Sequence, residues 1–158
     1  MANILKRFTD IMSANINALL DKAEDPAKMV DQYIRDIESD LGNVKAETAA
    51  VMAAEKKAKR GLDGNTQEME KMTRYAEKAL RAGNENDARV FLEKKTALAG
   101  QRQSLEQAYA AAQANSDHMR RMHDKLEKDL AQLQQRRSAI KAKMAVAKTQ
   151  GERNPLGS

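Results

Sequence analysis

The hydrophobic residues of the chain follow a helical period in three stretches, which two short breaks separate. In the first stretch, at about 100° per residue, eight apolar side chains fall within roughly half of a helix circumference. They are Ile4, Leu5, Phe8, Ile11, Met12, Ile16, Leu19 and Leu20. Polar residues occupy the other half, so the pattern predicts one amphipathic helix over residues 3–22.

A break at residues 22–25 separates this helix from a much longer one. Asp25 is a suitable N-cap, and Pro26 suits the first helical position, where its missing N–H is not needed. From residue 30 to residue 76, mostly apolar or small residues recur at alternating spacings of four and three. A run of this length is typical of a coiled-coil strand, which predicts a helix over residues 26–82.

The second break is rich in glycine, asparagine and acidic residues. Gly83 can adopt the left-handed conformation just beyond a helix, and Asn86 or Asp87 can cap the helix that follows. A second run of four-and-three spacings then extends from Phe91 to Met144 without a slip. This run predicts a second long coiled-coil helix.

Two long helices joined by a short turn are expected to fold back as an antiparallel hairpin. With the turn centred between Gly83 and Asn84, both runs fit one register, which favours a hairpin over an open helix or a parallel dimer. The predicted seam pairs are Ile34 with Leu133, Ile37 with Leu130, Leu41 with Leu126, Leu62 with Leu105, Met69 with Leu98, and Ala76 with Phe91.

The predicted fold class is therefore all-α: a long antiparallel coiled-coil hairpin preceded by a short N-terminal amphipathic helix. The expected parts are the amphipathic helix at 1–24, the hairpin at 25–150 (helix 26–82, turn 83–87, helix 87–150) and a flexible tail at 151–158.

One zone of the predicted hairpin is weak. Gly61 and Gly64 lie on the first helix, and Asn65 occupies a seam position opposite Arg102, which lies near Gly100. Each glycine costs roughly 1 kcal/mol relative to alanine in a helix interior. Two interpretations are open: a tolerated weak spot, or a bending point that adapts a rod to curvature.

Composition agrees with a coiled coil and limits the classes of function. Of the 158 residues, 3% are aromatic and 32% are charged, and none is cysteine, which excludes disulfides and thiolate zinc sites. No apolar run is long enough to span a bilayer, and the interrupted N-terminal stripe does not match a signal peptide.

The charged residues are unevenly distributed. Residues 1–87 hold 14 Lys/Arg and 16 Asp/Glu, whereas residues 88–158 hold 14 Lys/Arg and 7 Asp/Glu. This basic later part favours an anionic surface or an acidic partner.

Candidate catalytic chemistry is sparse. The glycines match no phosphate-binding loop. His118 and His123 are five residues apart, which directs them to different helix faces and makes them a poor metal pair. The lysine and arginine clusters lack the interleaved aromatic residues that stacking on nucleic acid uses. We expect no enzymatic activity, no cofactor, no metal site and no nucleic-acid partner.

The N-terminal apolar stripe has two interpretations. It can pack against the hairpin or against a second copy of itself, or it can lie in a membrane interface. Lys6 and Arg7 near the free amine, with Phe8 among the apolar positions, suit the membrane interpretation. Ordering the helix offsets part of the gain from burial, so a single copy is expected to bind weakly and to benefit from multivalency.

The sequence also resembles the phage shock protein A family, which includes the vesicle-inducing protein of plastids. The resemblance is carried by the opening NILKRFTDIMSANINALLDKAEDPAKMVDQYIRDIESDLGNVK and by the turn EKALRAGNENDARVFLEKK, and it covers nearly the whole chain. It implies envelope-stress proteins that bind the cytoplasmic face of stressed membranes, polymerise into rings or rods and remodel bilayers. The implied fold is similar to that of the ESCRT-III superfamily, and some members restrain a transcriptional activator.

One departure from the family pattern affects the expected assembly. Family members continue past the hairpin with further short helices that cross neighbouring subunits, whereas this sequence stops at Ser158. We therefore expect homo-oligomerisation to be weakened if those helices are absent, with membrane binding retained.

Residues and resemblance together predict a membrane-stress protein, located in the cytoplasm and peripheral on the inner face of the plasma membrane. Its expected partners are anionic lipids and further copies of itself. The alternative is a regulatory module whose hairpin sequesters a transcriptional activator. The predicted membrane-binding residues are Ile4, Leu5, Lys6, Arg7, Phe8, Ile11, Met12, Ile16, Leu19 and Leu20.

Overall fold

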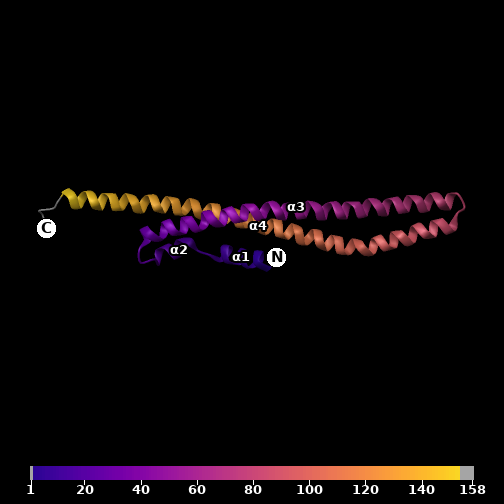
Figure 1. Ribbon diagram of the computed structural model, residues 1–158, viewed down its shortest axis with the longest axis horizontal. Helices are drawn as coiled ribbons and strands as arrows, with labels where there is room; N and C mark the ends of the chain where they lie inside the picture. Colours follow the sequence, from indigo (N-terminus) through magenta and orange to yellow (C-terminus); the bar gives the residue numbers. More distant parts are fainter. Residues whose placement is uncertain (1, 154–158) are drawn as a thin grey trace. The chain divides into compact units, whose positions relative to one another are not determined.

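The computed structural model describes residues 2–153 and contains, over this range, four helices and no strand. They are α1 (Ala2–Ser13), α2 (Ile16–Asp21), α3 (Pro26–Arg81) and α4 (Glu85–Arg153). The two long helices, α3 and α4, pack against each other as an antiparallel hairpin (Figure 1). The predicted all-α class and the predicted hairpin are confirmed.

The start of α3 follows from its first residues. Pro26 occupies the first helical position. The Asp25 carboxylate accepts a hydrogen bond from the Lys28 backbone N–H at 3.3 Å, and the Asp25 carbonyl accepts one from Met29 N–H at 3.0 Å. Asp25 is therefore the N-cap that the sequence predicts.

The turn between α3 and α4 has the geometry that a glycine permits. Gly83 has φ +75°, a conformation that L side chains rarely adopt. Its N–H donates to the Leu80 carbonyl at 3.1 Å, and Asn84 N–H donates to the Ala79 carbonyl at 2.7 Å. These two bonds satisfy carbonyl groups at the end of α3 and reverse the chain within a few residues.

The start of α4 differs from the prediction. The helix begins at Glu85, so the expectations that Asn86 or Asp87 caps it and that the turn extends to residue 87 are wrong. Asn84 takes the capping position, because its carbonyl accepts from Ala88 N–H at 3.1 Å. The Asn84 side chain also donates to the Asp87 carboxylate at 2.9 Å, which places Asp87 in the first helical turn. The compact glycine turn therefore leads directly into the second helix.

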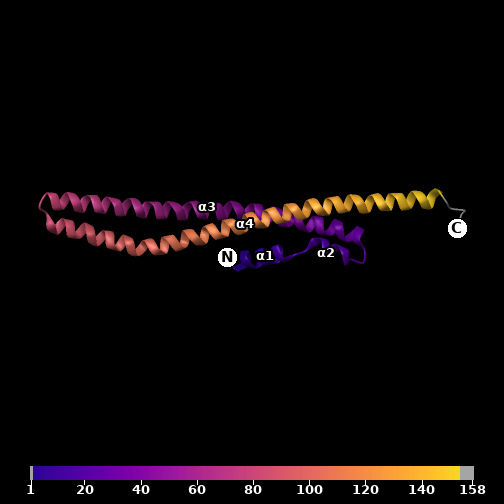
Figure 2. The same cartoon turned by 180° about the vertical axis from the view of Figure 1, so that it is seen from behind.

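The far end of α4 also differs from the prediction. The helix continues through Gly151 and ends at Arg153, so residues 151–153 belong to it. The rest of the expected flexible tail, residues 154–158, lies outside the described residues. Toward its end, α4 extends beyond the start of α3, as two opposite views of the ribbon show (Figures 1 and 2).

The chain divides into two compact units. The N-terminal unit comprises residues 1–47 and 118–158, and the turn unit comprises residues 48–117. Both contain a section of the α3–α4 seam. In the N-terminal unit the predicted core residues Ile34, Ile37, Leu126 and Leu133 are buried, and Leu41 and Leu130 are half-buried. In the turn unit Leu62, Met69, Phe91, Leu98 and Leu105 are half-buried.

Two contacts between the arms lie close to the predicted register, whereas the hydrogen bonds of Asn65 with Leu98 and of Ser116 with Glu55 lie four residues from it, about one helical turn. In the turn unit, the Arg102 guanidinium donates to the Thr66 hydroxyl at 2.5 Å. In the N-terminal unit, the Arg137 guanidinium lies 3.9 Å from the Asp31 carboxylate. Both pairs are one residue away from the register centred between Gly83 and Asn84.

The weak zone lies inside the turn unit. Asn65 is buried at 6% exposure, and its Nδ2 donates to the Leu98 carbonyl at 2.9 Å, whereas its Oδ1 has no hydrogen-bond partner among the described residues. A Cβ atom built at Gly64 or at Gly100 would meet nothing within 4 Å. The space around these two glycines therefore does not require glycine.

Alanine at either of these glycines should stabilise the hairpin. Gly64→Ala and Gly100→Ala should each raise the free energy of unfolding by about 0.5–1 kcal/mol, because alanine loses less backbone entropy on folding. Urea unfolding followed by circular dichroism measures the change. Gly83→Ala is the matched control and should destabilise the protein, since its φ is +75°. Equal effects at all three positions would contradict this account of the glycines.

Candidate functional site: the N-terminal segment docked on the hairpin

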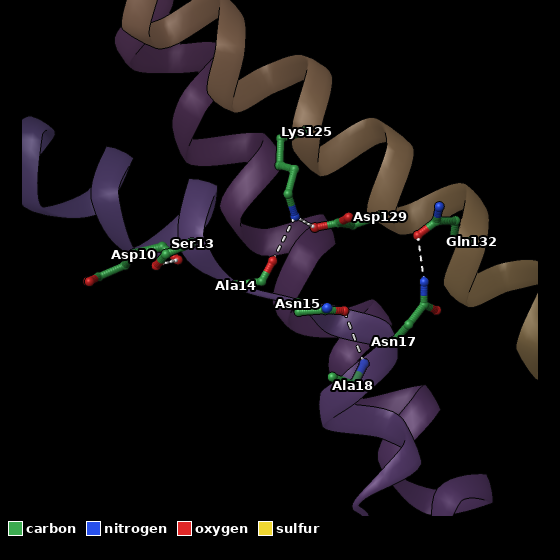
Figure 3. Close-up of polar contacts among 9 residues, drawn as sticks. All are labelled: Asp10, Ser13, Ala14, Asn15, Asn17, Ala18, Lys125, Asp129 and Gln132. Carbon is green, nitrogen blue, oxygen red and sulfur yellow. Dashed lines mark hydrogen bonds and ion pairs between the residues drawn. The ribbon is translucent and has the colours of Figure 1, made fainter.

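The N-terminal segment, residues 2–21, forms two helices and not the single helix that the sequence predicts. The break falls at Ala14 and Asn15. Asn15 is extended, with φ −108° and ψ 93°, and its side-chain oxygen accepts a hydrogen bond from Ala18 N–H at 3.1 Å (Figure 3). Asn15 is therefore the N-cap of α2, a local preference that the uninterrupted apolar spacing concealed.

A lysine from α4 holds the end of α1. Lys125 Nζ donates to the Ala14 carbonyl at 3.0 Å and to the Asp129 carboxylate at 2.5 Å (Figure 3). A cation at this place satisfies a carbonyl that the helix leaves free and interacts favourably with the helix dipole. The Asp129 side chain is 9% exposed and the Lys125 side chain 22%, so this contact is mostly shielded from water.

Polar contacts also join α2 to α4. The Arg136 guanidinium donates to the Asn17 carbonyl at 3.1 Å and to the Asp21 carboxylate at 2.6 Å. The Asn17 side-chain amide donates to the Gln132 side-chain oxygen at 3.1 Å (Figure 3). These side chains fix both the position and the direction of the short helix α2.

Two contacts hold α1 nearer its start. The Arg7 guanidinium forms an ion pair with Asp40 of α3. The ring of Phe8 lies against the ring of His118 of α4, with centroids 4.4 Å apart and planes at 44°. His118 Nδ1 is buried and has no hydrogen-bond partner among the described residues. α1 thus contacts both arms of the hairpin.

The apolar stripe of the segment divides between the hairpin and solvent. Ile11, Ile16 and Leu20 are buried, at 6%, 8% and 0% exposure. Leu5, Met12 and Leu19 are exposed, at 51%, 38% and 46%. Of the remaining predicted membrane-binding residues, Ile4 and Phe8 are half-buried, and Lys6 and Arg7 are exposed.

The docked segment reveals a second row on α4 that the heptad analysis missed. Its members again alternate in spacing between four and three residues: His118, Met122, Lys125, Asp129, Gln132 and Arg136. Met122 is fully buried and is the only large aliphatic side chain in this row. Because the other members are polar, hydrophobic periodicity does not detect the row, whereas the four-and-three spacing itself was available in the sequence.

Other features of the described residues offer weaker sites. A cavity of about 360 Å³ lies beside the Ala14–Asn15 break and includes Lys128 in its lining.

His123 lies close to two acidic side chains. Its Nδ1 is 3.7 Å from the Asp124 carboxylate, and its Nε2 is 3.3 Å from the Glu127 carboxylate. One ligand atom from each of His123, Asp124 and Glu127 lies within 4.8 Å of the other two, but both acids are exposed, and exposed acidic groups of this kind are common without a metal. Within residues 2–153, no helix has the length and apolar content needed to cross a membrane.

Comparison with known proteins identifies the class. The model of the PspA/IM30 family matches residues 3–153, and the chain therefore belongs to this family. It is 59% identical over 156 residues to the phage shock protein A homolog of Bacillus subtilis, a match that spans 99% of this chain and 69% of that protein.

More distant relatives agree with this assignment. Membrane-associated protein Vipp1 of Nostoc punctiforme is 29% identical over 93% of this chain and 57% of its own length. Vipp1 of Synechocystis is 30% identical over 94% of this chain and 56% of its own length. The chain thus spans a little more than half of the length of these two Vipp1 proteins.

Truncation of Met122 should destabilise the N-terminal unit. Met122→Ala should lower the free energy of unfolding by about 2–4 kcal/mol, because it leaves a cavity at a fully buried position. Met52→Ala is the matched control. Met52 is 48% exposed, so its replacement should change stability by less than about 0.5 kcal/mol. Urea unfolding compares the two variants, and equal midpoints would mean that the second row is not packed.

Proposed function

We propose that this protein binds membrane surfaces peripherally through its N-terminal segment, as part of the membrane-stress response and membrane maintenance that its family membership supports. The two Vipp1 relatives are named membrane-associated proteins. The hairpin carries the segment and serves as the building block of an assembly.

The observation that carries this proposal is the row of exposed apolar side chains on the segment. Leu5, Met12 and Leu19 follow one another at intervals of seven residues, and each is more than a third exposed. Lys6 and Arg7 lie beside the start of the row. Large apolar residues flanked by cations are typical of helices that lie in the boundary between headgroups and acyl chains.

The energetics favour a weak, reversible anchor. Burial of apolar surface contributes about 25 cal/mol per Å², so a few inserted side chains supply several kcal/mol. The segment is already helical in the structure, which lowers the ordering cost of insertion. Several anchors on one assembly would bind much more tightly than one, because each further contact is intramolecular.

The charge distribution supports anionic lipid as the partner. Residues 88–158 hold 14 Lys/Arg against 7 Asp/Glu. Each basic residue near an anionic surface contributes about 1 kcal/mol within a Debye length. Electrostatic attraction therefore recruits the protein, and apolar burial retains it.

Removal of the exposed row should weaken membrane binding while the fold is retained. The triple variant Leu5→Ser, Met12→Ser, Leu19→Ser should reduce the affinity for anionic vesicles at least about tenfold, because it removes the apolar contacts that are available without unfolding. Co-sedimentation with vesicles measures the bound fraction.

A matched triple variant controls for general loss of surface hydrophobicity. Met52, Val90 and Leu92 are 48%, 47% and 47% exposed and lie in the turn unit. Their replacement by serine should leave vesicle binding unchanged. If both triple variants bind like the unaltered protein, the N-terminal segment is not the membrane anchor.

Salt should weaken the binding only in part. Rising ionic strength screens Lys6, Arg7 and the basic later part of the chain, but it does not screen apolar burial. The bound fraction on anionic vesicles should fall between low and physiological salt and then level off. Complete release at moderate salt would show that the apolar row does not insert.

A further inference from the structure

We propose that the docking of the N-terminal segment on α4 is an autoinhibitory contact, which anionic lipid phosphate opens. This inference rests on the proposed membrane function and concerns the regulation of the same segment. In the closed state the break at Ala14 and Asn15 holds half of the apolar stripe against the hairpin. In the open state the segment is one continuous helix with its whole stripe on the membrane.

The observed burial of the stripe does not fit one continuous helix. Ile11 and Leu20 are nine residues apart, so at about 100° per residue they lie on opposite sides of a continuous helix. Both are nevertheless buried in the structure, at 6% and 0% exposure. The break makes this possible because it lets α2 take a direction of its own. The closed state therefore depends on the break.

A continuous helix redistributes the same side chains. Leu5, Met12 and Leu19 then fall near the middle of the stripe, and Ile11 and Leu20 form its two edges. The central residues are those that the closed state already exposes. They can make first contact with lipid, whereas insertion of the edge residues requires release from the hairpin. One set of side chains thus serves two mutually exclusive surfaces.

Cations of α4 form the polar part of this contact. Lys125 holds the Ala14 carbonyl at the break, and Arg136 holds the Asn17 carbonyl and the Asp21 carboxylate. A lipid phosphate offers these cations the same kind of oxygen acceptor, and arginine binds phosphate in a bidentate manner. Anionic headgroups can therefore replace the groups of the segment. When Lys125 is withdrawn, the backbone at the break is free to close into a helix.

Whether removal of one positive charge strengthens or weakens vesicle binding tests this proposal. Arg136→Gln removes a positive charge, so simple attraction to anionic lipid predicts weaker binding. The autoinhibitory contact predicts the opposite, about three- to tenfold stronger binding at subsaturating lipid, as expected for loss of a partly exposed charged contact. Vesicles of mixed zwitterionic and anionic phospholipid are the probe, with circular dichroism to verify that each variant is folded.

Lys128→Gln is the matched control. Lys128 lies on the same helix, is exposed, lines the cavity beside the break, and makes no hydrogen bond to the N-terminal segment among the described residues. Its replacement removes the same charge and should leave binding unchanged or slightly weaker. If both variants weaken binding equally, α4 does not restrain the segment and the proposal is overturned.

A covalent lock provides the reciprocal test. The protein has no cysteine, so Asn17→Cys and Gln132→Cys introduce a unique pair at positions whose side chains are hydrogen-bonded across α2 and α4. Linking them with a short bis-maleimide should reduce vesicle binding at least about tenfold, because the stripe cannot leave the hairpin. The same variant treated with a monofunctional maleimide should still bind.

The outcomes separate failure of this inference from failure of the proposed function. If the locked protein binds as well as its monofunctional control while the serine variant of the exposed row does not bind, the segment is the anchor but docking does not inhibit it. If the serine variant also binds as well as the unaltered protein, the proposed membrane function of the segment is wrong. The proposed autoinhibitory contact is then wrong too, because it rests on that function.

Discussion

The arrangement of the N-terminal unit depends on α4 presenting two rows of side chains to two partners at once. One row, with Leu126 and Leu133, is apolar and packs on α3. The other row, with Lys125, Gln132 and Arg136, receives the N-terminal segment. Because the two rows repeat with the same spacing, a single helix can serve both partners within the N-terminal unit.

The chemical difference between the rows separates permanent from reversible packing. Side chains of the α3 row exclude water and have no favourable alternative in solution. The second row combines one buried apolar side chain, Met122, with hydrogen bonds and ion pairs, and only the polar contacts are open to replacement by phosphate. The structure therefore combines a stable hairpin with a segment whose attachment is open to competition, and this combination suits a protein that responds to the state of a membrane surface.

Much of the fold could be predicted because its signals are local and strong. Pro26 after a capping Asp25 marks the start of α3, and Gly83 marks the turn. The break at Asn15 was not predicted, because the apolar spacing continues across it and a capping asparagine is also tolerated inside a helix. The capping role of Asn84 was missed because Asn86 and Asp87, a few residues further on, were the caps that the sequence suggested.

The docking of the segment was one of two open alternatives and could not be decided from the pattern. A stripe that covers half a helix suits either a hairpin groove or a membrane. Its partner row on α4 contains one large aliphatic residue, Met122, and so lacks the usual signal of a second seam. Three-dimensional contacts such as Lys125 with the Ala14 carbonyl were needed to find it.

The most direct test of the account measures the distance between the N-terminal segment and α4 with and without lipid. Spin labels on Ser13→Cys and Lys128→Cys would both lie in the lining of the cavity beside the break, one on the N-terminal segment and one on α4, in a chain that has no other cysteine. Electron paramagnetic resonance should give one short distance in solution and a long, broad distribution on anionic vesicles. A short distance that persists on vesicles carrying bound protein would contradict the account.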